Sequence, residues 1–394
     1  MANAFHLSLQ ASDGAPLARV TTRLSLGGKL RSSQTDENGK AVCQLPSRPK
    51  KGQLEIGPLP MHWSIGEVVD FAKVDHRDFV ATRLPLATDG LGWWHRVIGL
   101  RRTDPTLGRG ISIGIIDSGC ANHPALGHIH PFGSFLAGNL PQPGIDDEVE
   151  HGTHVCGIIG ARPSAATEYS GIAPAAELVV ARVETAASGG SSQLDIANAL
   201  DALVTHGVHL VNLSLGARKL SNILSDSIIN AWLNGVVCFA AAGNLGGNLL
   251  WPAQHEKVIA VTALGRLSET CSGSLSNLLL SDATQMDTDL DVAFAEFCCR
   301  GPQTRCCAPG IGIISTIGTA TGGSWGDLSG TSMASPMALA TLAAVLGRDS
   351  AYLGADADED RASLVLETLE NHCRPLSFDP DVQGNGLVML DISF

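Results

Sequence analysis

The sequence is poor in positive charge. Its 394 residues contain 26 Lys and Arg against 39 Asp and Glu, which gives a formal net charge of -13 at pH 7. A nucleic-acid surface or an anchor to anionic membranes needs clustered cations, and the sequence has no long basic block. We therefore expect neither a nucleic-acid partner nor a membrane partner.

Long hydrophobic runs are also absent. No stretch approaches the roughly 18 uninterrupted apolar residues of a transmembrane helix. The start, MANAFHLSLQASDGAPLARV, lacks a basic segment followed by a long apolar one. These features predict a cytoplasmic protein, with secretion by a route other than a signal peptide as the alternative. The 44% of hydrophobic residues can form a sizeable core in two or three domains.

Cysteine is present at ten positions, which leaves disulfides, buried thiols and a zinc site as alternatives. The segment FCCRGPQTRCC brings Cys298 and Cys299 close in sequence to Cys306 and Cys307. Vicinal residues on an extended strand point to opposite faces, so the four thiolates cannot easily converge on one metal ion. We expect buried thiols or disulfides, and no metal.

Residues 1–60 alternate apolar and polar side chains, as in ARVTTRLSLGG and GQLEIGP, between turn clusters such as SDGAP and DENGK. This pattern predicts a small all-β domain. The segment DGAPLARVTTRL, followed by TDENGKAVCQLP, resembles the small immunoglobulin-like β-sandwich modules. We interpret it as an accessory domain or pro-domain, either retained or inhibitory. Residues 61–107 are expected to form a connecting segment with one helix.

From residue 110 onward, short β-branched runs alternate with Ala- and Leu-rich segments, for example ISIGIID, DIANALDALVTHG and LVNLSLG. This alternation predicts an α/β fold with a mostly parallel sheet, right-handed crossovers and helices on both faces. Functional sites in such sheets form at the carboxyl ends of the strands. We therefore expect functional side chains where the predicted strands end.

Four polar residues lie at element ends of this kind. Asp117 ends ISIGIID, His151 begins a predicted helix in EVEHGTHVCGIIGA, Asn244 ends FAAAGN, and Ser332 precedes an apolar helix in DLSGTSMASPMALATLAAVLG. Taken singly, Asp117 and Asn244 are typical turn residues and Ser332 is a typical helix cap. His151 and His154 share a helix face, but no carboxylate or cysteine at helical spacing completes a metal site with them.

Taken together, the four residues have a chemical meaning. A nucleophilic serine needs a base to take its proton, a carboxylate to orient that base, and donors for the oxyanion that forms on the substrate carbonyl. The motifs IIDSG, HGTHVCG, AAGN and GTSMASP occur in the order of the subtilisin-like serine proteases, or subtilases, which residues 108–394 resemble. The resemblance implies the three-layer subtilisin-like fold and serine endopeptidase activity.

The resemblance also implies a role for each residue. Ser332 corresponds to the nucleophile and His151 to the general base and then acid. Asp117 corresponds to the orienting carboxylate, in DSG where the family more often has DTG. Asn244 corresponds to an oxyanion donor, which the N–H of Ser332 at a helix N-terminus would join as a second donor. His154 is expected to be a structural neighbour.

The segment NLSLGA resembles the family strand that pairs with an extended peptide. Residues 214–216 would form one wall of the S1 pocket, residues 241–244 the other, and Leu250 a narrow floor. No carboxylate lies between residues 244 and 253 to neutralise a basic P1 side chain, so we expect apolar P1 residues of medium size. The expected substrate-binding residues are Ser214, Leu215, Gly216, Ala242, Gly243 and Leu250.

Two segments depart from the family. ARPSAATEYSGIAP has one carboxylate, Glu168, where many secreted members have a calcium loop, and calcium prefers six to eight oxygen ligands. We expect no cofactor. The second segment, residues 264–296, is an acidic insertion, which we interpret as a solvated rim loop or a partner surface.

The expected function is cleavage of a peptide or protein substrate, in turnover or in maturation of a dedicated partner. The alternative is a catalytically idle peptide-binding scaffold.

Overall fold

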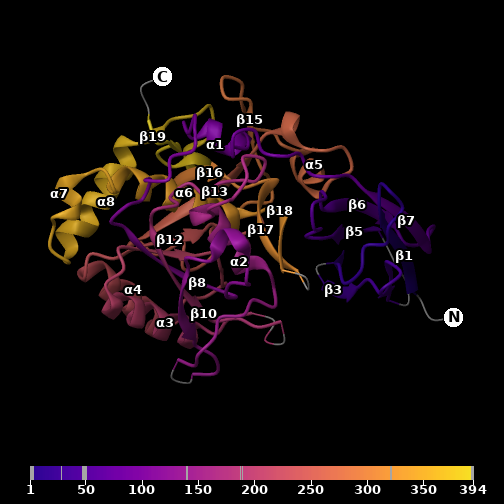
Figure 1. Cartoon of the computed structure of the whole chain (residues 1–394), viewed down its shortest axis with the longest axis horizontal. Coiled ribbons are helices and arrows are strands. Elements are labelled where there is room, and N and C mark those ends of the chain that lie inside the picture. Colours follow the sequence, from indigo (N-terminus) through magenta and orange to yellow (C-terminus); the bar gives the residue numbers. More distant parts are fainter. Residues whose placement is uncertain are drawn as a thin grey trace.

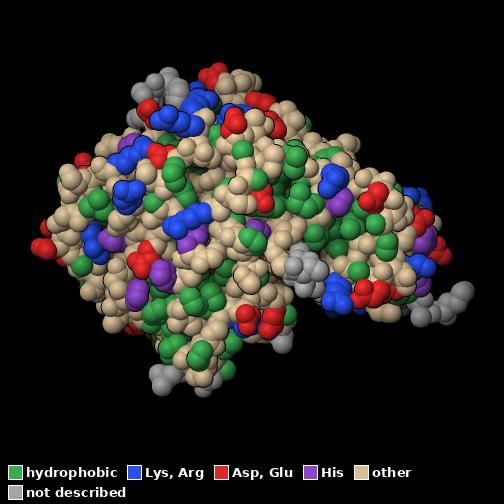
Figure 2. Space-filling view, in the orientation of Figure 1, with side chains coloured by type: hydrophobic (Ala, Val, Ile, Leu, Met, Phe, Trp, Pro, Cys, Tyr) green, Lys and Arg blue, Asp and Glu red, His purple; other side chains and the backbone are tan. Residues whose placement is uncertain are grey.

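The structure is a computed structural model that describes residues 4–27, 29–46, 51–138, 141–186, 188, 190–319 and 322–391. A small β-domain at the N-terminal end and a large α/β domain form its two lobes. The β-domain is the smaller lobe on the right of Figures 1 and 2.

The N-terminal domain is a sandwich of two sheets. One has the strand order β4-β1-β7 and the other β3-β2-β5-β6. Side chains along β1 alternate between the interior and solvent, as burial of one sheet face requires. The inward side chains, including Phe5, Leu24, Leu54 and Phe71, form a hydrophobic core separate from that of the α/β domain. The strands are β1 (Ala4–Ala11), β2 (Thr21–Leu26), β3 (Lys29–Gln34), β4 (Lys40–Gln44), β5 (Lys51–Ile56), β6 (Ile65–Asp70) and β7 (His76–Ala81).

The β-domain extends past residue 60, where the sequence predicted its end. Strand β6 pairs antiparallel with β5, and β7 pairs parallel with β1 from His6–His76 to Ala11–Ala81. The predicted connecting segment 61–107 therefore contains two sandwich strands as well as its one helix, α1 (Trp93–Val97). Pairing of β7 with the first strand joins distant parts of the sequence, so no local pattern specifies it.

The α/β domain confirms the predicted fold class. In the described residues its main sheet has eleven strands, with the order β19-β20-β16-β13-β12-β11-β8-β10-β9 and with β14 and β15 beside β13. The strands from β9 to β16 along this order pair in parallel. The strands are β8 (Ser112–Asp117), β9 (His130–Ser134), β10 (Glu177–Arg182), β11 (Leu210–Leu213), β12 (Val237–Ala241), β13 (Val258–Gly265), β14 (Met286–Asp287), β15 (Val292–Phe294), β16 (Thr304–Pro309), β19 (Cys373–Arg374) and β20 (Leu387–Val388), and a separate hairpin consists of β17 (Ile313–Thr319) and β18 (Gly322–Leu328).

Helices cover both faces of the sheet (Figure 1). Helices α3 and α4 pack together in one hydrophobic cluster, and α2, α6 and α8 contribute to another. The helices are α2 (His151–Gly160), α3 (Gln193–His206), α4 (Asn222–Leu233), α5 (Leu275–Leu280), α6 (Thr331–Leu346), α7 (Ser350–Leu353), α8 (Glu359–Asn371) and α9 (Pro380–Gln383), with short 3-10 helices at Pro124–Leu126 and Leu267–Glu269.

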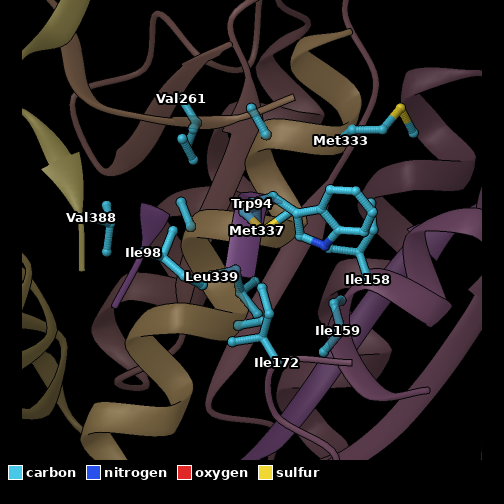
Figure 3. Packing of buried hydrophobic residues seen from close by; sticks show 14 of the residues in the cluster. Trp94, Ile98, Ile158, Ile159, Ile172, Val261, Met333, Met337, Leu339 and Val388 are labelled. Atoms are coloured by element: carbon cyan, nitrogen blue, oxygen red, sulfur yellow. The ribbon is translucent and has the colours of Figure 1, made fainter. Parts of the chain in front are cut away.

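Helix α6 is buried almost all round, because the sheet, α2 and α8 each contact part of its surface. In Figure 3 Met337 and Leu339 of α6 lie in one cluster with Trp94 and with Ile159 of α2. The strongly apolar sequence of this helix follows from that position. Tight packing on all sides fixes its first turn, which carries Ser332.

The acidic insertion 264–296 joins the two domains and is not a solvated loop. Its helix α5 packs on β6, and the Leu275 N–H donates to the Ser64 carbonyl at 2.7 Å. Its strand β15 extends the main sheet beside β13. One of its carboxylates, Asp287, is buried and accepts hydrogen bonds from the backbone N–H groups of Leu290 and Ser377. The insertion therefore contacts both domains and holds the β-domain against the α/β domain.

All ten cysteines are free thiols, nine of them buried and Cys271 partly buried. In the part of the chain that the structure describes, no three His, Cys, Asp or Glu side chains converge on a position for a metal ion. None of the described helices combines the length and apolar character needed to cross a membrane.

Candidate active site

Four adjacent parallel strands lead to polar residues at one edge of the sheet. Strands β12, β11, β8 and β10 are neighbours in that order. Asp117 ends β8, Ser214 follows β11, Asn244 lies three residues after β12, and Glu184 lies two residues after β10. Because parallel strands bring their carboxyl ends to the same edge, these distant parts of the sequence meet there.

Asp117 and His151 form the central polar contact of this edge. His151 Nδ1 donates to Asp117 Oδ1 at 2.7 Å. The same oxygen accepts from the Ser118 N–H at 2.7 Å and from Ser118 Oγ at 3.3 Å. Asp117 is buried, whereas the His151 side chain keeps 29% of its surface exposed. With Nδ1 bound to the carboxylate, Nε2 is the ring nitrogen left for proton transfer.

The environment of His151 raises its pKa above the ordinary value. Burial disfavours the charged imidazolium and lowers the pKa, but the Asp117 carboxylate and its hydrogen bond outweigh that effect. Asp147 and Glu184 add smaller contributions in the same direction. His151 is therefore a stronger base than a free imidazole.

Gly152 allows α2 to begin beside Asp117. A Cβ at position 152 would lie 2.2 Å from the Gly119 carbonyl oxygen, so only glycine fits this close approach. The Gly152 N–H also donates to Ser118 Oγ at 2.9 Å. The His-Gly pair of the motif thus places the imidazole against the carboxylate.

His154 has the environment of a structural residue. It is fully buried, and its Nε2 contacts the carbonyl oxygens of Ile313 and Gly326 at 3.0 and 3.2 Å. Burial lowers its pKa to about 3, so the ring is neutral and donates to these carbonyls. The side chain fixes α2 against the β17–β18 hairpin.

Ser332 is the second residue of α6 and contacts the segment that follows β11. Its Oγ donates to the Ser214 carbonyl at 3.4 Å, while its own carbonyl accepts from Ser214 Oγ at 2.7 Å. Ser214 lines the same cleft as His151. The Ser332 hydroxyl is thus directed to the Ser214 carbonyl, and among the described residues no hydrogen bond joins it to His151.

Two buried residues hold Ser214 in place. Asn212 Nδ2 donates to Ser214 Oγ at 2.8 Å, and Ser335 Oγ donates to Asn212 Oδ1 at 2.8 Å. Asn212 lies in the motif NLSLG and Ser335 in the motif GTSMASP, and no pattern within either motif predicts that the two residues pair. This chain of hydrogen bonds connects α6 with the end of β11.

Asn244 is exposed but its orientation is fixed. Its Oδ1 accepts from the Thr331 N–H at 3.0 Å and from Thr331 Oγ1 at 2.9 Å. Thr331 Oγ1 in turn accepts from the Gly243 N–H at 3.0 Å. With both contacts on Oδ1, the Nδ2 group of Asn244 remains available to a ligand oxygen.

Leu250 lies between the two expected walls of the S1 pocket. A Cβ at Gly243 would lie 2.7 Å from Leu250 Cγ, and a Cβ at Gly216 would lie 3.0 Å from Leu250 Cδ1. The Leu250 N–H donates to the Ala242 carbonyl at 2.9 Å. The structure thus brings residues 214–216, residues 242–243 and Leu250 together.

A cleft of about 470 Å³ runs past Asp117 and His151. Ser214, Leu215 and Gly216 line it, and the β-domain contributes Arg23, Glu55 and Pro58 to its lining. No sequence signal points to Arg23 or Glu55, because only the docking of the β-domain brings them to the cleft. Glu184 was also missed, although its place after a strand resembles that of Asp117.

Comparisons of the sequence with known proteins identify its relatives. The sequence model of the subtilase family matches residues 108–376. Over 230 residues the chain is 33% identical to subtilisin Savinase of Lederbergia lenta, covering 58% of this chain and 73% of that protein. The chain is also 33% identical over 230 residues to an alkaline protease of Shouchella clausii, and this match covers 58% of this chain and 52% of that protein. A thermostable alkaline protease of Halalkalibacterium halodurans is 29% identical over 283 residues, or 72% of this chain and 67% of that protein.

Proposed function

The chain belongs to the subtilase family and is a serine endopeptidase, and on this premise we propose that Asp117, His151 and Ser332 form its catalytic triad. The observation that supports the triad most directly is the 2.7 Å hydrogen bond from His151 Nδ1 to Asp117, in a cleft shared with Ser214. Ser214 Oγ in turn donates a hydrogen bond to the Ser332 carbonyl oxygen.

In the proposed reaction Ser332 Oγ attacks the carbonyl carbon of the scissile peptide bond while His151 Nε2 accepts the hydroxyl proton. The imidazolium then gives this proton to the leaving amine as the C–N bond breaks. A water molecule, deprotonated by His151, hydrolyses the acyl-enzyme and regenerates Ser332. Asp117 keeps Nδ1 protonated and stabilises the imidazolium in both halves of the cycle.

Two donors serve the oxyanion of the tetrahedral intermediates. Asn244 Nδ2 is one, since the contacts of Oδ1 with Thr331 fix the amide in the required orientation. The backbone N–H of Ser332 at the start of α6 is the second. Such donors act where charge develops and therefore lower the barrier rather than strengthen substrate binding.

The substrate binds as an extended strand along residues 214–216. Its P1 side chain, next to the scissile carbonyl, enters the slot between Gly216 and Gly243. Leu250 occupies the base of this slot and limits its depth. Residues 244–253 contain no carboxylate, so medium apolar side chains are preferred at P1.

We place the enzyme in a reducing compartment, the cytoplasm, where it cleaves peptide or protein substrates in turnover or in maturation of a dedicated partner. The ten free thiols support this location, since oxidising compartments favour disulfides. Thiol titration of protein purified from its native source, before and after unfolding, tests it: ten reactive thiols in the unfolded protein are expected, and a substantially smaller number contradicts the location.

Labelling with a fluorophosphonate probe tests the catalytic proposal. The parent protein is expected to bind the probe covalently at Ser332 and to cleave unfolded protein substrates. Ser332→Ala should lose both properties while keeping its fold. A folded parent that binds peptides but neither reacts nor cleaves would instead be a peptide-binding scaffold.

A further inference from the structure

Glu184 places a carboxylate in the cleft from a fixed backbone position. The N–H of the preceding residue, Val183, donates to the Asp117 carbonyl at 2.9 Å. The Glu184 side chain is partly buried and lines the cleft together with His151. Its Oε2 accepts from Ser191 Oγ at 3.4 Å. This single long hydrogen bond leaves most of the accepting capacity of the carboxylate unused among the described residues.

The charges around Glu184 favour an incoming cation. Burial raises its pKa, the Asp117 carboxylate raises it further, and His151 acts in the opposite direction. The neighbouring Arg182 binds Glu148 through Nη2 at 3.0 Å and the backbone carbonyl of Glu184 through Nε at 3.2 Å. Among the described residues no Lys or Arg forms an ion pair with the Glu184 carboxylate. A substrate cation would therefore meet a partly desolvated, unpaired negative charge.

The position of this charge relative to the S1 slot determines which substrate residue meets it. An extended peptide points successive side chains to opposite sides. When P1 enters the slot between Gly216 and Gly243, P2, the preceding residue, points to the other side of the peptide. His151 and Glu184 line the same cleft, and neither is one of the residues around the S1 slot. P2 is therefore the side chain that we expect to meet them.

We propose that Glu184 is a specificity-determining residue that selects lysine or arginine at P2. This inference rests on the proposed function and adds a second requirement to it: an apolar P1 side chain preceded by a basic P2 side chain. The P2 ammonium or guanidinium group donates to the Glu184 carboxylate, which forms no ion pair among the described residues. The preference comes from a charge contributed by the end of β10, outside the four catalytic motifs.

Two fluorogenic peptides test the proposal. Both have Leu at P1, and they differ only at P2, which is Lys in one and norleucine in the other, so that they differ by the charged amine. The parent enzyme is expected to cleave the Lys peptide with about tenfold higher kcat/KM, the size of effect typical of one charge-assisted hydrogen bond. Glu184→Gln keeps the side-chain volume and should bring the ratio close to one.

A matched control uses the cleft-lining glutamate of the β-domain. Glu55→Gln removes the same charge from another part of the cleft and should keep the parent ratio. If Glu55→Gln abolishes the ratio as well, the preference comes from the overall negative field and the assignment to Glu184 is wrong. Equal cleavage of both peptides by the parent also overturns the proposal, while Ser332-dependent cleavage would leave the proposed function standing.

Binding to the Ser332→Ala protein tests the selection of P2 by Glu184 separately from the proposed catalysis by Ser332. Fluorescence anisotropy with the same two peptides needs no turnover, so it reports on Glu184 even if the parent cleaves neither peptide. About tenfold tighter binding of the Lys peptide, lost in Ser332→Ala/Glu184→Gln, supports the proposal. Equal affinities contradict it.

Discussion

Ser214 Oγ donates to the Ser332 carbonyl oxygen at 2.7 Å, and Pro336 explains why this oxygen is available. In an α-helix the carbonyl of residue 332 would accept from the N–H of residue 336, but proline has no N–H. The proline thus leaves an unpaired carbonyl at the proposed nucleophile, and the segment after β11 supplies its donor. The fold in this way connects the segment after β11 to Ser332 itself.

This relationship predicts a coupled pair of substitutions. Ser214→Ala should lower the unfolding free energy by about 1–3 kcal/mol, because it leaves the partly buried Ser332 carbonyl without this donor. In Ser214→Ala/Pro336→Ala the N–H of residue 336 can take over that carbonyl, so the double variant should recover part of the loss. Chemical denaturation in a Ser332→Ala background, which avoids self-digestion, measures the coupling. Additive losses would show that the two donors do not compete for one acceptor.

The triad predicts strongly non-additive kinetics. His151→Ala and Ser332→Ala should each remove nearly all peptidase activity, and the double variant should be little worse than either, because the two residues act as one unit. Single-turnover cleavage of a fluorogenic peptide gives the three rates. If the rate of the double variant falls by the product of the two single losses, His151 and Ser332 act independently and the triad assignment is wrong.

Asn244→Ala is expected to lower kcat by roughly 100- to 1,000-fold with little change in KM, because the amide donates mainly to the developing oxyanion. Thr331→Val removes the hydroxyl that bonds Asn244 Oδ1 and should lower kcat to a smaller extent, since the Thr331 N–H still holds the amide. Steady-state kinetics distinguishes these effects from a loss of binding. An increase in KM alone would contradict the oxyanion role.

The sequence predicted the α/β domain well because each motif of the proposed site is local. Asp117, His151, Asn244 and Ser332 each occur within a few residues of a strand end or helix start, and parallel pairing brings those ends to one edge. The order of the motifs therefore carried most of the information about the site.

The remaining features depend on contacts between distant segments. Pairing of β7 with β1 extends the β-domain to Ala81, and α5 of the insertion packs against β6. Neither contact has a signature within its own segment. The same holds for the hydrogen bond from Ser335 to Asn212, since a buried serine and asparagine acquire a shared role only when α6 lies over the end of β11.

Asp327 in β18 connects the two domains and makes their stability depend on pH. Its Oδ1 accepts from the Ser64 N–H at 2.6 Å, while its buried Oδ2 has no partner in the described structure. Burial raises its pKa from 3.8 to about 6. Between about pH 4 and pH 6 the folded protein therefore holds a proton that the unfolded chain releases, so this group stabilises the fold less as pH rises.

Asp327→Asn removes that titration and keeps an oxygen for the Ser64 N–H. The unfolding free energy of the variant minus that of the parent should increase by about 2–3 kcal/mol from pH 4 to pH 7, given about 1.4 kcal/mol per pKa unit. Urea denaturation of both proteins at several pH values, again with Ser332→Ala, measures the difference. A difference that stays constant with pH would show that folding does not raise the pKa of Asp327.

Leu250 provides the test of specificity at P1. Its side chain lies against Gly216 and Gly243, so it occupies space that a larger P1 side chain would need. Full burial of an apolar side chain stabilises a complex by up to about 1.5–3 kcal/mol, whereas an uncompensated Lys or Arg costs several kcal/mol in the same slot. The parent should therefore prefer Leu or Met at P1 over Phe or Trp, and Leu250→Gly should shift the preference toward the larger side chains.

Profiling with a mixed peptide library measures both effects. The matched control is Leu249→Ala, which changes a buried neighbour of Leu250. A dominant Arg or Lys at P1 in the parent would show that a carboxylate from elsewhere in the cleft reaches the slot, and that its apolar character does not decide the cleavage site.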